Sequence, residues 1–493
     1  MSFSGAIRFC SSVLLFIALA GCATSARTAK AGAAQPEPEA AAPAAGPAEA
    51  EASGEATAAP PESERPYESI AAFVALGDAE SALREFGRLY EERPQDHETR
   101  LLYARLLIMA GQREAARAEL DALRAEAPRD ADVLFLSALL EGQEGRLEAE
   151  RELLEDALEA QPEHADALAV LGDLLLAERK DEEARRLFES ARRSEPENTV
   201  ALQGMAELAL RGGEYGEAVE LLTGIVEREP DNALALVDRA EARRKLGEDA
   251  AALGDLDRAI ELDPEYYWSR VDRARIRIER SELAGALDDL DRAVEIDPEY
   301  FLAYVLRGQI HYRLAHVPEA ADDFLAVRRL RPDFSSIDAP LGACLFRLGR
   351  YGEARQAFLL AAKAEPEDHS LPLLVSLCLK KEGREADSRA YLSGILPGLE
   401  RRSWQYEVAR YYLTPSSDFS IVDLANREKN DAVRYRLLFY IASQQLLQGR
   451  KLSALSYFGE VREIAARLRL GTSSIEAMIG EAELARLEGS VAR

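Results

Sequence analysis

The sequence is poor in the residues that would place it in several common classes of protein. Only 4 of its 493 residues are cysteine, too few for a disulfide-bonded scaffold. Aromatic residues make up 7%, which favours stacked helices of small and aliphatic side chains over a β-sandwich. No run of 18 apolar residues occurs, so we expect no membrane-spanning helix. Basic residues are outnumbered, 61 against 88 acidic ones, and the net charge of −27 argues against nucleic acid as a partner.

The first 21 residues have the composition of a secretory leader. They carry one basic residue, Arg8, and then the apolar run Val13–Ala20, which is too short to span a bilayer. The next string, Leu19-Ala20-Gly21-Cys22, resembles the bacterial lipobox, in which the leader is removed ahead of a cysteine that is joined to diacylglycerol. The resemblance implies that residues 1–21 are a lipoprotein signal peptide and that Cys22 carries the acyl chains that hold the protein on a membrane. An ordinary secretory leader followed by a chance cysteine is the alternative.

The residues after Cys22 bear on where the protein is held. Ala23 replaces the aspartate of the enterobacterial sorting rule, so the resemblance implies an outer-membrane protein that faces the periplasm. Residues 23–66 contain no Val, Leu, Ile, Met or aromatic residue and are rich in Ala, Pro and Glu. Such a segment buries too little apolar surface to offset its ordering entropy, so we predict a disordered tether over residues 22–66.

A 34-residue period runs through the next 300 residues or so. Nine prolines stand at this interval: Pro94, Pro128, Pro162, Pro196, Pro230, Pro264, Pro298, Pro332 and Pro366. Glycine recurs 17 residues before the proline, alanine 12 before it, and phenylalanine or leucine 8 before it. Glycine permits a tight turn between two helices, alanine lets the helices approach closely, and proline separates one unit from the next.

These marks, with the strings Leu345–Pro366 and Arg258–Pro264, resemble the tetratricopeptide repeat (TPR) family of helix–turn–helix units. The resemblance implies an all-α fold, a right-handed superhelix (α-solenoid) of about ten to eleven repeats, with the regular array over residues 67–397. A few positions depart from the pattern. Glu150 replaces the small alanine, Arg179, Ser281 and Ala315 replace the turn glycine, and Pro340 is expected to kink the first helix of the ninth unit.

Residues 398–493 are less regular. An irregular connector around Arg401–Leu413 precedes a late TPR-like unit at Tyr435–Ile464 and a final helix at about Ser474–Leu487, which we expect to cap the last repeat. This layout is similar to the C-terminal half of NlpI-type outer-membrane TPR lipoproteins. Charge changes there as well, because this segment has 14 basic and 12 acidic residues in an otherwise acidic chain.

No pattern of an enzyme, a cofactor site or a metal site is found in the sequence. Of the five histidines, His311 and His316 are five residues apart, which places them off a shared helical face and argues against a metal pair. Cys344 and Cys378 occupy equivalent points of neighbouring units, too far apart for a disulfide, so we expect two reduced, partly buried thiols. We therefore predict a protein that binds partners rather than one that catalyses a reaction.

The TPR resemblance implies that the first helix of each unit lines a groove through its positions 2, 5, 9, 12 and 13. Positions 2 and 5 of units five to eight are mostly apolar, and Tyr312 lies at the far end. The predicted partner-binding strip consists of Leu234, Val237, Trp268, Val271, Leu302, Val305 and Tyr312, with Val200 and Gln203 at its near end. In units two to four, position 2 is Glu98, Asp132 and Asp166, so we expect an acidic approach to the groove. Packing between repeats is the alternative role for these side chains.

Two functions remain open from the sequence. The preferred one is a membrane-anchored TPR lipoprotein that acts as an adaptor or scaffold in the cell envelope and binds proteins or peptides, with basic or amphipathic segments favoured. The alternative is a small-molecule-binding TPR lipoprotein that assists solute uptake. A long apolar strip favours the adaptor, because a solute site needs an enclosed pocket with convergent polar groups.

Overall fold

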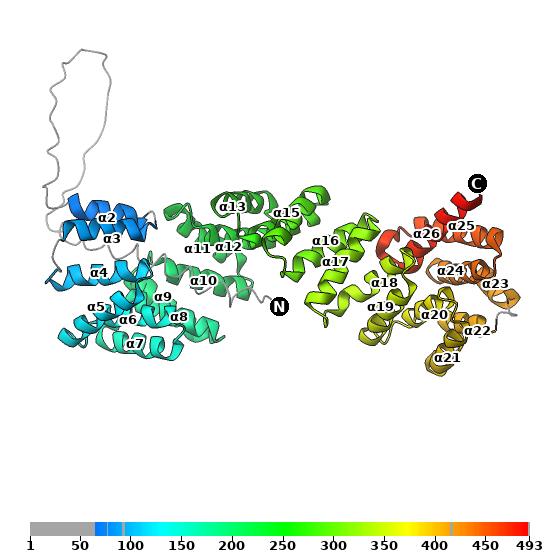
Figure 1. The fold of residues 1–493 in the computed structure, drawn as a ribbon, viewed down its shortest axis with the longest axis horizontal. Helices are drawn as coiled ribbons and strands as arrows, with labels where there is room; N and C mark the ends of the chain where they lie inside the picture. Colours follow the sequence, from blue (N-terminus) through cyan, green and yellow to red (C-terminus); the bar gives the residue numbers. More distant parts are fainter. Residues whose placement is uncertain (1–64, 76, 91–93, 415–417, 492–493) are drawn as a thin grey trace, which may run out of the picture. The chain divides into compact units, whose positions relative to one another are not determined.

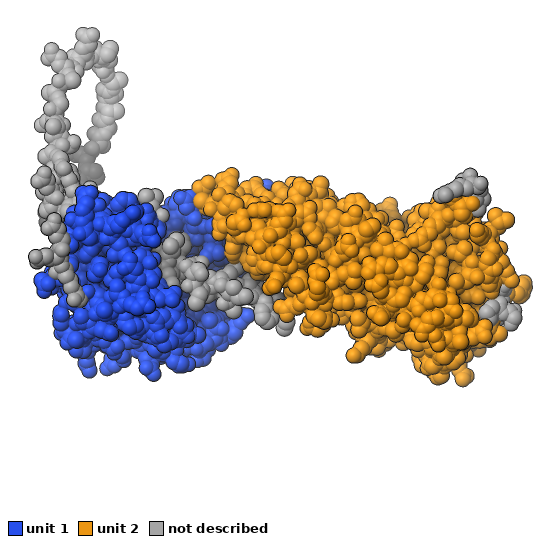
Figure 2. Space-filling model, in the orientation of Figure 1, with its two compact units in different colours: residues 1–255 blue, residues 256–493 orange. Residues whose placement is uncertain are grey.

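The computed structural model describes residues 65–75, 77–90, 94–414 and 418–491. The expected signal peptide, Cys22 and residues 23–64 of the expected tether lie outside the described residues. Within the described ranges the chain forms helices and no strand, which confirms the all-α prediction. The chain divides into two compact units, residues 1–255 and 256–493, and the boundary falls inside helix α13 (Asp249–Leu262) (Figure 2).

The first unit is a succession of helix pairs in which each helix packs on the next along the chain (Figure 1). Its helices are α2 (Arg65–Ala75), α3 (Ala79–Leu89), α4 (His97–Met109), α5 (Arg113–Glu126), α6 (Ala131–Gln143), α7 (Leu147–Ala160), α8 (Ala165–Ala177), α9 (Asp181–Ser194), α10 (Thr199–Gly212), α11 (Tyr215–Arg228) and α12 (Ala233–Lys245). Even-numbered helices are the first helices of the repeats, and odd-numbered ones are the second.

The second unit continues the pairs and then departs from them. Its elements are α14 (Tyr267–Glu279), α15 (Leu283–Ile296), α16 (Phe301–Arg313), α17 (Val317–Leu330), η2 (Ser335–Ile337), α18 (Asp338–Arg347), α19 (Tyr351–Ala364), α20 (Leu371–Lys381), α21 (Glu385–Ile395), η3 (Leu396–Gly398), α22 (Trp404–Leu413), α23 (Asp418–Arg427), α24 (Asp431–Leu447), α25 (Lys451–Arg467), η5 (Gly471–Ser473) and α26 (Ile475–Val491). Helices α22 and α23 cover the expected connector, and α24 and α25 cover the expected late pair.

Local sequence explains where these helices begin and end. Several first helices start at an Asp or Asn whose side chain caps the helix: Asp130 Oδ1 accepts a hydrogen bond from the Val133 amide at 3.0 Å. The turn inside each pair requires a left-handed residue, and Gly213 supplies it with φ of 79°. Arg179, Ser281 and Ala315 adopt the same conformation without being glycine, with φ between 58° and 64°.

Pro340 does not kink a helix interior, contrary to the sequence prediction. It lies in the first turn of α18, which starts at Asp338, after the short turn η2. Proline is tolerated there because the first-turn amides have no partner within the helix. The chain therefore starts this first helix late rather than bending it.

Small residues let the paired helices approach closely. The alanines 12 residues before each proline are fully buried, and Ala286 is 0% exposed. Glycines of the first helices lie under the phenylalanine rings of second helices: a Cβ on Gly204 would stand 2.2 Å from the ring of Phe188. The spacing between helices is therefore set by residues that have little or no side chain.

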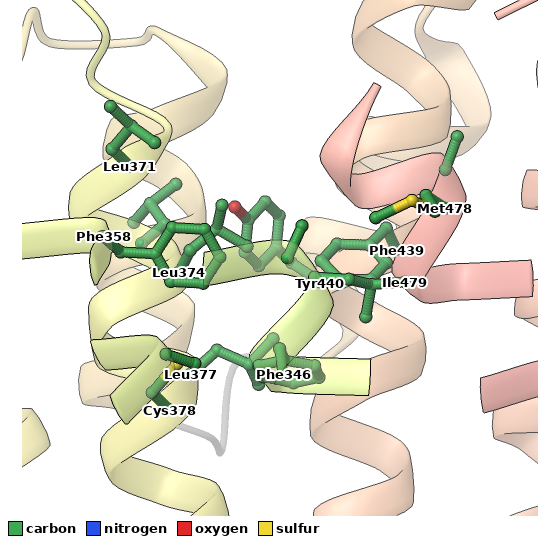
Figure 3. Packing of buried hydrophobic residues seen from close by; sticks show 14 of the residues in the cluster. Phe346, Phe358, Leu371, Leu374, Leu377, Cys378, Phe439, Tyr440, Met478 and Ile479 are labelled. Atoms are coloured by element: carbon green, nitrogen blue, oxygen red, sulfur yellow. The ribbon is translucent and has the colours of Figure 1, made fainter. Parts of the chain in front are cut away.

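Helix α26 does more than cap the last repeat. It packs on α24 and α25, as expected, and it also packs on α18, more than 120 residues earlier in the chain. Figure 3 shows Met478 and Ile479 of α26 beside Phe439 and Tyr440 of α24, within a core that also holds Phe346 and Leu377. The last helix thus joins the late pair to repeats nine and ten in one core.

Candidate protein-binding surface

The structure separates the predicted strip into a buried half and a partly exposed half. At position 5, Val237, Val271 and Val305 are 2%, 0% and 6% exposed. Val271 packs against Ala274 and Leu290 within its own part of the core. These three valines contribute to packing between helices, so this half of the strip does not present a surface to a partner.

Position 2 keeps part of its surface in units six to eight, whereas Val200 of unit five is buried. Leu234 in the first unit, and Trp268 and Leu302 in the second, are half-buried. Tyr312 is also half-buried and packs against the core around α18 and α26, and burial raises the pKa of its hydroxyl. The surface left from the predicted strip in the second unit therefore centres on Trp268 and Leu302.

Aromatic side chains surround Trp268 where the first helices begin. They form a row across three repeats, which we call the aromatic row: Tyr267, Trp268, Tyr300, Phe301 and Phe334. The Trp268 ring centroid lies 5.2 Å from that of Tyr267 and 4.7 Å from that of Tyr300 in the next repeat. Phe301 meets Phe334 edge to face at 5.3 Å.

The aromatic row is held in place by its own contacts. The rings of Tyr267 and Tyr300 are 4.9 Å apart, so Trp268 and these two tyrosines contact one another in all three pairings. The Arg331 guanidinium lies 5.2 Å from the centre of the Phe301 ring. Rings that are already packed and only half-buried lose little conformational freedom when a partner covers them, which suits protein recognition.

A ladder of buried ion pairs joins first helices to second helices, and the sequence reasoning missed it. Arginines 34 residues apart on first helices pair with aspartates 34 apart on second helices: Arg239 with Asp255, Arg273 with Asp289, and Arg307 with Asp323. The nitrogen–oxygen distances are 2.6, 2.5 and 2.6 Å. The shared period could have revealed the ladder, but spacing alone does not show that these charged side chains are buried.

Each aspartate of the ladder is almost completely buried and each arginine makes a second contact. Asp289 is 1% exposed and also accepts a hydrogen bond from Arg277 at 2.7 Å. Burial acts to lower the pKa of Arg307, but hydrogen bonds to Asp323 and Asp291 outweigh it and leave that pKa raised. The ladder is therefore a set of buried ion pairs that holds second helices to first helices.

The acidic approach predicted at units two to four is only partly available. Glu98 and Asp132 are exposed, but the Asp132 carboxylate lies 3.4 Å from His164 Nε2, whose hydrogen bond lowers the pKa of Asp132. Asp166 is half-buried and accepts a hydrogen bond from Asn198 at 2.8 Å. Two of the three carboxylates thus also connect one repeat to the next.

His311 and His316 lie together, so the argument that separated them was wrong. Their Nδ1 atoms are 3.4 Å apart. Helix α16 ends at Arg313, and Ala315, with φ of 58°, turns the chain so that His316 folds back over the last turn. Helical spacing does not apply past the end of a helix. Within the residues that the structure describes, no group of three or more His, Cys, Asp or Glu side chains is arranged to hold a metal ion.

The two described cysteines and a surface hollow remain to be considered. Cys344 and Cys378 are unpaired, as expected, and both are buried; burial raises the pKa of the Cys344 thiol to about 12. A hollow between α9 and α11 is lined by the charged side chains of Arg192, Glu217, Glu220 and Arg228 and by small and apolar residues. Over the described ranges, no helix is both long and apolar enough to cross a bilayer.

Comparison with protein-family models finds tetratricopeptide repeats in both units. One model matches residues 73–140, 143–208 and 175–243, and a second matches residues 271–333 and 305–369. The matched ranges together span more than half of the chain. No curated protein matches the sequence.

Solved structures of bacterial proteins resemble parts of the chain. Pseudomonas aeruginosa pilF is 20% identical, with a TM-score of 0.38, over 41% of this chain and 92% of its own. A tetratricopeptide repeat protein from Parabacteroides merdae is 20% identical, with a TM-score of 0.34, over 50% of this chain and 98% of its own. The Thermus thermophilus TPR protein TTC0263 is 20% identical, with a TM-score of 0.31, over 37% of this chain and 99% of its own.

Proposed function

The chain belongs to the tetratricopeptide repeat family, whose helix pairs serve as protein–protein interaction scaffolds, and we propose that it performs this role as a lipid-anchored adaptor in the cell envelope. The anchor is the lipid on Cys22, and the tether over residues 22–66 holds the repeats away from the membrane. The proposed location is the periplasmic side of the outer membrane. The string that ends at Cys22 supports the anchor, because only a cysteine supplies the sulfur for the thioether.

The partner-binding surface is the aromatic row together with Leu302. The observation that carries this assignment is the contact of Trp268 with tyrosines of two repeats, which prearranges a half-buried aromatic surface across α14 and α16. Tryptophan and tyrosine are enriched among the residues that dominate binding energy in interfaces. The high negative charge of the chain favours partners with basic or amphipathic segments.

A solute-binding role is the weaker candidate. Small ligands are held in enclosed, mostly apolar pockets with a few convergent polar groups. The hollow between α9 and α11 differs from this description, since the side chains of Glu217, Glu220 and Arg228 that line it are exposed.

Removal of the lipid acceptor tests the anchor. Cys22→Ser leaves no thiol to acylate, so the variant should not incorporate labelled palmitate and should leave the membrane fraction. Cys10→Ser is the matched control, since Cys10 lies in the leader and its loss should change neither result. A Cys22→Ser protein that still labels and sediments with membranes would show that the lipoprotein assignment is wrong.

Trimming the aromatic row tests the binding surface. Trp268→Ala should weaken partner binding by about 2 kcal/mol, roughly 30-fold in Kd, while the repeats stay folded. Val271→Ala is the matched control on the same helix, because its side chain is fully buried and should affect stability rather than binding. Equal losses of binding in both variants, in step with lost helicity, would assign Trp268 to the core instead.

A further inference from the structure

The last helix of the chain is connected to the repeats by a short segment. Between the end of α25 at Arg467 and the start of α26 at Ile475, Arg469 and Gly471 have positive φ values of 54° and 49°. Residues 481, 485, 486 and 488–490 of α26 are exposed, whereas residues 476–480 are buried. Helix α26 therefore packs on α25, the helix before it, and its first half enters the core of the second unit.

The apolar residues of α26 fill a surface made by several first helices. Met478, Ile479, Leu484 and Leu487 are between 1% and 6% exposed. In Figure 3, Met478 and Ile479 lie beside Phe439, with Phe346 on the near side of the same core. We call the surface that receives α26 the C-terminal seat; it comprises Phe346, Arg347, Lys381, Arg436 and Phe439.

The C-terminal seat is basic although the chain as a whole is strongly acidic. Lys381 Nζ pairs with Glu483 of α26 at 2.9 Å, and both side chains are largely buried, at 12% and 8% exposed. Arg436 Nε lies 3.7 Å from a Glu476 carboxylate oxygen. At the other end of the contact, Arg486 of α26 donates a hydrogen bond to the carbonyl oxygen of Arg347.

The seat occupies positions through which repeats of this family line their ligand groove. Counted as in the regular units, Phe346 and Arg347 are positions 12 and 13 of the ninth unit, and Lys381 is position 13 of the tenth. Arg436 and Phe439 are positions 2 and 5 of the late unit. Helix α26 thus contacts these groove positions of repeats nine and ten in addition to packing on α25, the helix that precedes it.

We propose that the C-terminal seat is a binding site for acidic amphipathic helices, and that α26 is the resident helix, which a partner helix of the same chemistry displaces. The recognised pattern has two carboxylates seven residues apart, as in Glu476 and Glu483, with large apolar residues between and after them. Seven residues are two helical turns, so both carboxylates lie on one face. Recognition of a partner at the seat rests on the proposed scaffold role.

The fit of α26 in the seat is incomplete, which makes displacement feasible. Glu476 is 4% exposed, and its Oε1 atom accepts no hydrogen bond within the described residues. Its other oxygen accepts one from Ser474, its own neighbour, at 3.2 Å. A buried carboxylate that lacks a full set of donors weakens the docking of the helix that carries it. A partner that places its carboxylate nearer Arg436 would bind the seat more tightly.

A peptide with the sequence of residues 472–491 tests this in the full chain. Ile479→Asp puts a charge on the face of α26 that enters the core, so α26 should leave the seat while α20 and α24 stay folded. The labelled peptide should then bind this variant at least tenfold more tightly than the wild type. Adding Lys381→Glu should reverse the gain, because it opposes Glu483 of the peptide. Leu452→Asp, at an exposed site on α25, is the matched control and should bind like the wild type.

Hydrogen exchange of the same variants makes every outcome informative. Fast exchange confined to α26 in Ile479→Asp, together with peptide binding, supports the proposal. Loss of protection in α20 and α24 as well would mean that α26 is part of the fold and not a ligand. A released α26 with no peptide binding would also overturn the proposal. Exchange of α26 between two differently tagged wild-type copies would make the seat a self-association site instead. None of these results depends on the aromatic row.

Discussion

At the scale of single residues, Glu150 is the clearest departure from the repeat. It stands where the other eight regular units have alanine, and it is 8% exposed. A Cβ on Gly142 would be 2.4 Å from Glu150 Oε1, so the carboxyl occupies the space that this glycine leaves. Burial raises the pKa of Glu150 to about 7 and raises that of the nearby Asp173 well above its usual range.

This carboxyl makes the first unit less stable in alkaline than in acidic solution. Because the pKa is about 7 in the folded chain and 4.5 in the unfolded one, its contribution to stability is lost as the pH rises through 7. The loss reaches up to about 3 kcal/mol. Glu150→Gln cannot ionise, so its melting temperature should fall less than that of the wild type between pH 5 and pH 8.

Glu148→Gln provides the matched control, since Glu148 is exposed on the same helix. It should reproduce the wild-type dependence on pH. Thermal melts of the three proteins at both pH values check the prediction, and parallel curves for Glu150→Gln and the wild type would contradict it.

Ser281 shows a conformational cost that the sequence alone identified. The repeat pattern marked position 281 as a turn glycine, and Ser281 has φ of 63° there. Ser281→Gly should raise the unfolding free energy by about 0.5–1 kcal/mol, because it relieves the left-handed strain but adds unfolded-state entropy. In the reverse test, Gly349→Ala should lower stability by a similar amount, since Gly349 has φ of 79°. Urea denaturation that moves both midpoints in the same direction would refute this.

At the scale of helices, the regular part of the fold could be predicted and the charge network could not. Proline, glycine and alanine at fixed offsets determine where helices end and how closely they pack. The nine prolines at 34-residue intervals were therefore enough to predict the helix pairs. The ladder depends on which charged side chains are buried. The 34-residue spacing of Arg239, Arg273 and Arg307 can be read from the sequence. The burial of their aspartate partners cannot, because it arises only when the two helices pack together.

The ladder predicts that neutralising two carboxylates on α15 lowers the free energy of unfolding by very different amounts. Asp289→Asn removes the buried carboxylate that Arg273 and Arg277 share and leaves Arg273 only its exposed partner Asp257, which should cost about 3–5 kcal/mol. Glu295→Gln, by contrast, removes an exposed partner of Arg292 and should cost less than about 1 kcal/mol. Chemical denaturation measures both. Equal, small effects would mean that the ladder contributes little to the fold.

The predicted strip combined buried and partly exposed side chains, because helical spacing does not show how deeply a side chain is buried. Positions 2 and 5 lie on neighbouring faces of the same helix, and both are apolar in these repeats. The structure separates them: valine at position 5 is buried, whereas Trp268 at position 2 is half-buried among aromatic neighbours. Hydrophobicity alone gives no indication of which apolar face a neighbouring helix covers.

At the scale of the whole molecule, the sequence predicted the last helix but not all of its contacts. Repeat reasoning assumes that each unit touches only its neighbours, so α26 was expected only on the last repeat, α24 and α25. The packing of α26 on α18 and the Lys381–Glu483 pair are long-range contacts. The repeat period does not predict them, because it describes only neighbouring units.

The central claim, that the repeats bind a protein partner through the aromatic row, has one direct test. A photo-crosslinking amino acid placed at Trp268 in the full-length, membrane-attached chain should capture a defined protein in cells. The same residue at Leu360, an exposed position on α19, should capture none of it. The account predicts a crosslink at Trp268 that also appears at Leu302 and is absent at Leu360. No protein crosslink from Trp268 and Leu302, or equal capture of the same protein from Leu360, would contradict it.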